Sequence, residues 1–64
     1  MNEYEMSKSK FLKIYANIPI PLRVEIVAVI DDESLSWAAC RGEIENNTKR
    51  APKILDQLKH IGVL

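Results

Sequence analysis

Cysteine, histidine and glycine are scarce in this chain, and their scarcity excludes several classes of protein. The 64 residues include one cysteine, one histidine and two glycines. Cys40 has no second cysteine for an intrachain disulfide, and Cys40 with His60 cannot supply the roughly four ligands of a structural zinc site. Gly42 and Gly62 are too far apart to form a Gly-rich phosphate loop. The sequence therefore predicts neither a metal nor a cofactor.

Long apolar runs and an excess of charge of one sign are also missing. The longest apolar run, Ile26 to Ile30, is far shorter than the roughly 20 residues that a membrane-spanning helix needs. Nine basic and nine acidic residues cancel, so the whole molecule has no net attraction for nucleic acid or for a membrane. A single free thiol fits a reducing compartment. We expect a cytoplasmic protein that does not enter the membrane.

Residues that support catalysis are few. His60 is the only histidine, and it falls in the last turn of a predicted helix, where it complements the negative helix end. Cys40 lies on an apolar helix face, where a buried thiol is unreactive. The acidic run Asp31–Glu33 lacks the ligand spacing and the central glycine of a calcium-binding loop. These residues predict a protein that is not an enzyme.

Apolar side chains, by contrast, are plentiful enough for one small domain. They make up 47% of the chain, and we assign residues 1–64 to a single domain. A chain of this size buries only about 60% of the surface that its unfolded form exposes, so self-association is an expected source of further burial. The first residues, MNEYEM, are polar and lack a pattern. We predict that residues 1–6 form a disordered tail.

Three segments have the spacing and end signals of helices. In the first, SKSKFLKIYANIP, Ser7 or Ser9 can cap the start, and the following prolines predict an extended connector. The second begins after a Ser36 cap and ends near Asn46. The third has Pro52 in its first turn and Gly62 as the residue after its end. Their apolar faces comprise Phe11, Leu12, Ile14, Tyr15 and Ile18; Trp37, Cys40 and Ile44; and Ala51, Ile54, Leu55, Leu58 and Ile61.

The segment 24–30 fits two structures. As a helix starting at Pro21, it places Leu22, Ile26, Val29 and Ile30 on one face. As a strand, its apolar side chains alternate from Leu22 to Ile30. Five of its seven residues are β-branched, which favours a strand, and DDES and SLSW then supply a turn and a return strand. We predict an α+β fold with an N-terminal helix, a short β-hairpin and two C-terminal helices. The alternative is an all-α domain of four helices.

Several segments resemble a group of small prokaryotic proteins of unknown function. They are YANIP, EIVAVID, LSW, EIENNT and the closing KIL, and the resemblance covers nearly the whole chain. It implies no activity, cofactor or site residue. Similar sequences tend to carry Asp-Gly and a proline in the turn, where this chain has DDES, so the resemblance does not support a tight two-residue turn here.

Val27 and Val29 point to a protein-interaction or regulatory module. Strand alternation predicts polar residues at these two positions, which are apolar in this chain. A hairpin edge also presents unpaired N–H and C=O groups. We expect a homodimer that pairs hairpin edges about a two-fold axis and covers both valines, or else a complex with another protein.

A basic run before the last helix favours an alternative, a nucleic-acid-binding regulator. Lys49, Arg50 and Lys53 form the run, and the helices at 36–46 and 51–61 can imitate a helix-turn-helix. The net charge of zero and the nearby Glu43 and Glu45 count against this function. We therefore rank nucleic-acid binding below protein interaction.

Overall fold

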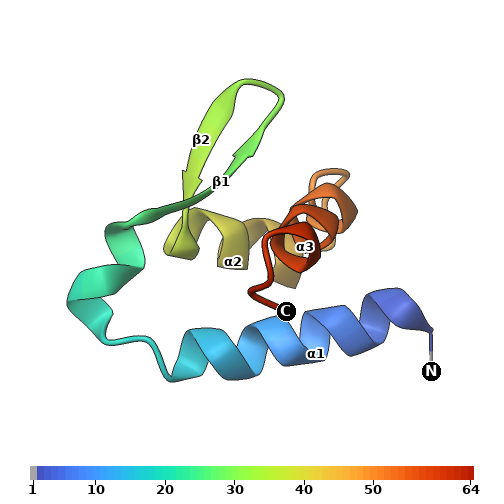
Figure 1. Cartoon of the computed structure of the whole chain (residues 1–64), viewed down its shortest axis with the longest axis horizontal. Coiled ribbons are helices and arrows are strands. Elements are labelled where there is room, and N and C mark those ends of the chain that lie inside the picture. The colour runs from blue at the N-terminus through green and yellow to red at the C-terminus, as the bar shows by residue number, and fades with distance from the viewer. Residues whose placement is uncertain (1) are drawn as a thin grey trace.

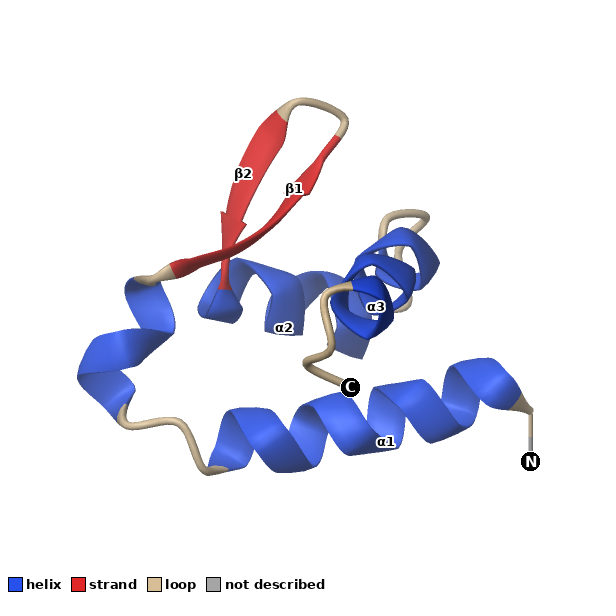
Figure 2. Cartoon of the chain, viewed as in Figure 1, coloured by secondary structure: helices blue, strands red, loops and turns tan. Residues whose placement is uncertain are grey.

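The computed structural model describes residues 2–64 and contains helices at both ends of the chain with a hairpin between them (Figure 1). The predicted α+β class and element order are confirmed, and the all-α alternative is wrong (Figure 2). The elements are α1 (Glu3–Ala16), the 3₁₀ helix η1 (Ile20–Val24), β1 (Ile26–Ile30), β2 (Glu33–Ser36), α2 (Trp37–Glu45) and α3 (Ala51–His60).

Helix α1 begins earlier than predicted. Its N-cap is Asn2, whose Oδ1 accepts a hydrogen bond from the Glu5 N–H at 2.8 Å, so neither Ser7 nor Ser9 caps the helix. The Tyr4 hydroxyl donates to Asn47 Oδ1, also at 2.8 Å, and ties the first turn to the loop after α2. The predicted disordered tail over residues 1–6 is therefore wrong from Glu3 onward, and Met1 lies outside the described residues.

The connector after α1 is extended only at its start. Pro19 has φ −55° and ψ 138°, which is the extended conformation that the prolines predict. From Ile20, however, the chain forms η1, in which Pro21 occupies the first turn and lacks only an N–H that would have no partner there. The Leu22 N–H donates to Pro19 O at 2.9 Å. The prediction of an extended connector is wrong over this turn.

The two strands form an antiparallel hairpin with a tight turn. Asp31 and Asp32 connect Ile30 to Glu33, and both have positive φ, 51° and 66°. Positive φ at both central residues is the type I′ geometry that matches the twist of paired strands. Segment 26–30 is thus a strand, as predicted, and the turn has two residues although it contains no glycine.

A β-bulge in β1 changes which side chains face the core. Ile26 pairs with Ser36 and Ala28 with Leu35, so β1 carries one extra residue, Val27, between these pairs. Ala28 is buried, but Ile26 is 59% exposed. The single apolar strand face predicted from Leu22 to Ile30 therefore ends at the bulge.

The core lies between α1, the hairpin and the two C-terminal helices. Figure 1 shows α2 and α3 between α1 and the hairpin. The Phe11 ring is fully buried and stacks on Tyr15 and Trp37, with centroid distances of 6.1 and 5.9 Å. The other fully buried large side chains are those of Cys40, Ile44, Ile54 and Leu58. All three helices thus contribute to one core.

Local chemistry sets the ends of the C-terminal helices as predicted. Ser36 Oγ accepts a hydrogen bond from the Ala39 N–H at 3.1 Å and caps α2. Gly62 follows α3 with φ 85°, and the Val63 N–H returns to Leu58 O at 2.9 Å. Each of these ends is determined by residues close together in the sequence.

The type I′ turn predicts that Asp32→Gly stabilises the protein. Asp32 has φ 66°, a conformation that glycine adopts without the cost of a Cβ. We expect a gain of about 0.5 kcal/mol in the free energy of unfolding, measured by urea denaturation, because relief of the left-handed conformation outweighs the greater freedom of glycine in the unfolded chain. The control Asp56→Gly, inside α3, should instead cost about 0.3 kcal/mol, because aspartate is itself a poor helix former. Equal losses in both variants would contradict the turn geometry.

Candidate interaction surface

Large aliphatic side chains are exposed where η1 leads into β1. Ile20 is 74% exposed, Leu22 48%, Val24 75% and Ile26 59%, and we call these four residues the apolar corner. Figure 1 places η1 at one end of the molecule, between α1 and the hairpin. Of the larger elements, η1 packs chiefly against α2, so most of its surface faces solvent. The corner is formed by the 3₁₀ turn and the bulge, and strand alternation alone did not predict it.

The two valines predicted to contact a partner differ in exposure. Val27 is half-buried and packs against the core, whereas Val29 is 52% exposed. At Val29 the outer edge of β1 already has a partner in α3. The Val29 N–H donates to Gln57 Oε1, and Gln57 Nε2 donates to Val29 O, both at 2.8 Å. The predicted unpaired edge is therefore wrong at this residue, because the Gln57 amide occupies the place of a neighbouring strand.

Removing the Gln57 amide should loosen the hairpin. We expect Gln57→Ala to cost about 1–3 kcal/mol of unfolding free energy, since two hydrogen bonds are lost. Gln57→Glu keeps an acceptor for the Val29 N–H but cannot donate to Val29 O when ionised, so its cost should be of similar size. Hydrogen exchange at the Val29 amide should accelerate in Gln57→Ala. Unchanged exchange there would mean that Gln57 does not protect this edge.

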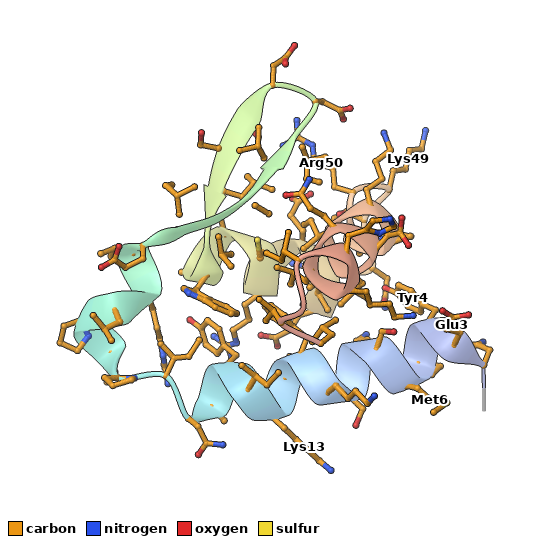
Figure 3. The ribbon with its side chains drawn as sticks, viewed as in Figure 1. Glu3, Tyr4, Met6, Lys13, Lys49 and Arg50 are labelled. Atoms are coloured by element: carbon orange, nitrogen blue, oxygen red, sulfur yellow. The ribbon has the colours of Figure 1, made fainter. Side chains whose placement is uncertain are left out.

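The basic run before α3 is largely paired with the hairpin turn. Arg50 forms an ion pair with Glu33, and Lys53 Nζ lies 3.5 Å from Asp31 Oδ1. The hydrogen bond that Arg50 donates to Glu33 also raises the pKa of the Arg50 guanidinium above its ordinary value. Lys49 is exposed and makes no ion pair within residues 2–64; Figure 3 shows it projecting from the surface. The turn carboxylates thus neutralise most of the predicted nucleic-acid surface.

Cys40 and His60, the residues most often used in catalysis, differ in their exposure to solvent. Cys40 is fully buried, and burial, with a smaller contribution from Glu43, raises the pKa of its thiol to about 11. His60 is exposed, with Nδ1 3.4 Å from Asp56 O. Cys40 is therefore a neutral thiol near pH 7, which is the unreactive form.

Residues 2–64 contain neither a metal-binding cluster nor a membrane-spanning helix. No group of three or more His, Cys, Asp or Glu side chains is placed there to hold a metal ion. None of the helices in this range is long and apolar enough to cross a membrane.

Comparison with known proteins assigns no function. No family model, curated protein or solved structure matches the chain. The resemblance to small prokaryotic proteins stays a prediction, and the exposed residues described above are the features that bear on function.

Proposed function

We propose that this protein is a non-enzymatic interaction or regulatory module that acts in the cytoplasm as a homodimer through its apolar corner. The observation that carries the proposal is the 48–75% exposure of four large aliphatic side chains within one short segment. Scattered apolar residues are common on protein surfaces, but four large exposed ones within residues 20–26 concentrate apolar surface in one segment, as binding surfaces do. Covering it would add burial that a chain of 64 residues has few other ways to gain.

The order of residues in the corner supports a second copy of this chain as the partner. Residues 22–26 read Leu-Arg-Val-Glu-Ile, so apolar residues stand at both ends and at the centre. Arg23 and Glu25 lie on either side of Val24. A two-fold axis near Val24 would set the copies antiparallel, with apolar residues facing apolar ones. The same patch is then self-complementary.

Edge-to-edge pairing of hairpins is less well supported than docking at the corner. Gln57 occupies the outer edge of β1 at Val29, and Val27 already packs against the core. The opposite edge belongs to β2, a short strand that ends in the Ser36 cap of α2. We therefore propose the same homodimer that the sequence predicts, with its contact at the apolar corner instead of the hairpin edge.

Nucleic-acid binding has less support as an alternative function. Phosphate binding depends on local positive charge, and the carboxylates of Glu33 and Asp31 beside Arg50 and Lys53 cancel much of it. Lys49 alone provides too little positive charge for strong binding to nucleic acid. Protein interaction is accordingly the function that the surface favours.

Sedimentation equilibrium at micromolar concentration tests the proposal. We expect a mass of about twice the 7.3 kDa of one chain. A single species of 7.3 kDa across the concentration range would contradict the dimer.

A further inference from the structure

The apolar corner is attached to the rest of the molecule through a charged side chain. Within residues 19–26, Arg23 is half-buried and all the other residues are exposed. Helix η1 contains no buried residue, so apolar burial contributes little to holding it against the body of the protein. The segment therefore has its apolar side chains in solvent and its arginine turned inward.

Arg23 makes two contacts with the first helix and the connector that follows it. Its Nε donates to Ile18 O at 3.0 Å, and its Cζ lies 4.5 Å from the centroid of the Tyr15 ring. A guanidinium at this distance over an aromatic face is attracted by the ring. Tyr15 is 7% exposed and its ring stacks on Phe11, so Arg23 rests on a surface that the core holds fixed.

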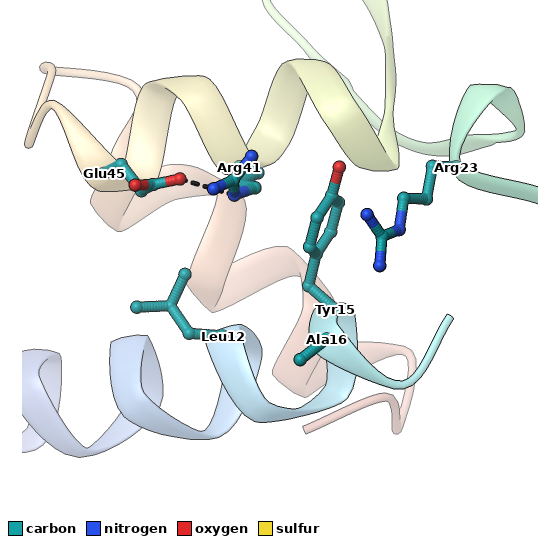
Figure 4. A pocket seen from close by; sticks show the side chains of 6 residues that line it. All are labelled: Leu12, Tyr15, Ala16, Arg23, Arg41 and Glu45. Carbon is teal, nitrogen blue, oxygen red and sulfur yellow. Dashed lines mark ion pairs between the residues drawn. The ribbon is translucent and has the colours of Figure 1, made fainter. Parts of the chain in front are cut away.

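The other face of the Tyr15 ring is covered by Arg41 of α2. The Arg41 Cζ lies 5.2 Å from the same centroid, and Figure 4 shows the ring standing between the two guanidinium groups. Arg41 also forms an ion pair with Glu45, one turn further along α2. The stack thus brings together residues of α1, η1 and α2, and Arg23 is its member from η1.

The backbone hydrogen bonds of the segment do not replace Arg23 as an attachment. The Leu22 N–H donates to Pro19 O at 2.9 Å and the Glu25 N–H donates to Leu22 O at 3.1 Å, so both bonds close turns within the segment. The Trp37 N–H donates to Glu25 O at 3.1 Å and ties the far end of the segment to α2. Arg23 accordingly holds the middle of the segment.

We propose that Arg23 is a positioning residue that fixes the apolar corner in the arrangement that a second copy of the chain meets. Its role in the contact rests on the proposed dimer, whereas its hold on η1 does not. A segment that is ordered before binding loses less conformational freedom when the partner docks. In a two-fold contact both copies must present the corner, so a loss of order in the chain counts twice.

Hydrogen exchange measured by mass spectrometry tests the hold on η1 in the monomer, at a concentration below the dissociation constant of the dimer. Arg23→Lys keeps the charge but lacks the Nε donor and the planar guanidinium. We expect exchange in the peptide that covers η1 to accelerate about tenfold, the factor that corresponds to the loss of one such hydrogen bond. Exchange at the end of α3, where the Val63 N–H donates to Leu58 O, should stay within about twofold.

Arg41→Lys is the matched control. It makes the same change on the other face of the same ring, but α2 is held by its own helix hydrogen bonds and by the buried Cys40 and Ile44. We expect exchange in η1 to stay within about twofold in this variant. Tyr15→Phe keeps the ring and should behave like the wild type. Tyr15→Leu removes the aromatic face and should accelerate exchange in η1 relative to the end of α3.

Sedimentation equilibrium tests the consequence for the dimer. If η1 is correctly placed in about one third of the Arg23→Lys chains, a contact that needs both copies weakens about tenfold. We therefore expect the dissociation constant of the Arg23→Lys dimer to be about tenfold above that of the wild type, and that of Arg41→Lys to stay within about twofold.

Faster exchange in η1 of Arg23→Lys but not of Arg41→Lys, together with a weaker dimer, supports the proposal. Unchanged exchange in Arg23→Lys, equal acceleration in Arg41→Lys, or an unchanged dissociation constant despite faster exchange would overturn it. A wild-type protein that is monomeric at all concentrations would refute the dimer and with it the role of Arg23 in the contact. Faster exchange in Arg23→Lys would in that case still show that Arg23 holds η1.

Discussion

Replacing Phe11 with alanine is expected to cost about 3–5 kcal/mol of the free energy of unfolding. Phe11 is fully buried, and its ring stacks on both Tyr15 and Trp37. The substitution therefore removes the ring contact between Phe11 and Trp37, which joins α1 to the start of α2, and leaves a cavity in the core. Small domains have only about 5–15 kcal/mol of total stability, so this loss is a large share.

Urea denaturation followed by Trp37 fluorescence measures this cost. The control is Met6→Ala on the same helix, where the side chain is 49% exposed and the change should stay within about 0.5 kcal/mol. If Phe11→Ala does not fold at all, Phe11→Leu provides a milder test, with an expected cost of about 1–1.5 kcal/mol. Equal stability of the Phe11→Ala and Met6→Ala proteins would show that the core is not centred on Phe11.

The second large effect is expected at the apolar corner. Val24 is 75% exposed in the single chain and lies at the centre of the proposed contact. Val24→Asp would bury an unpaired carboxylate, and a two-fold axis places that change in the interface twice. We expect the dimer dissociation constant to rise by at least about 100-fold, with the fold of each chain preserved because the side chain contributes little to the core.

Ile61→Asp is the matched control for the corner. Ile61 is a similar aliphatic side chain, 58% exposed, at the end of α3. The same charge there should leave the dimer intact. Dissociation by both substitutions would indicate a general effect of added negative charge, and dissociation by neither would place the contact elsewhere.

Much of the fold could be predicted from the sequence because its signals are local. The Ser36 cap, Pro52 in the first turn of α3 and Gly62 after its last turn act on backbone groups within a few residues. The β-branched run before Asp31 likewise favours a strand through its own side-chain restrictions. Each of these features appears in the structure where it was predicted.

The features that were missed depend on contacts between distant residues. The first turn of α1 is held by the hydrogen bond between Tyr4 and Asn47, which are 43 positions apart. No pattern within MNEYEM predicts that bond. Gln57 pairs with Val29 across 28 positions. The bulge at Val27 depends on how β1 packs against both β2 and the core. The alternation of apolar residues along the strand therefore could not predict that Ile26 is exposed. The prolines around Ile20 were the one local hint of an irregular, exposed segment.

The position of the dimer contact is tested most directly by isotope-filtered NMR on a mixture of labelled and unlabelled chains. The proposed contact predicts intermolecular NOEs among the methyl groups of Leu22, Val24 and Ile26, because these side chains would meet their counterparts across the two-fold axis. Intermolecular NOEs confined to Val29 and the hairpin edge, or none at all under conditions where the protein is dimeric, would contradict docking through the apolar corner.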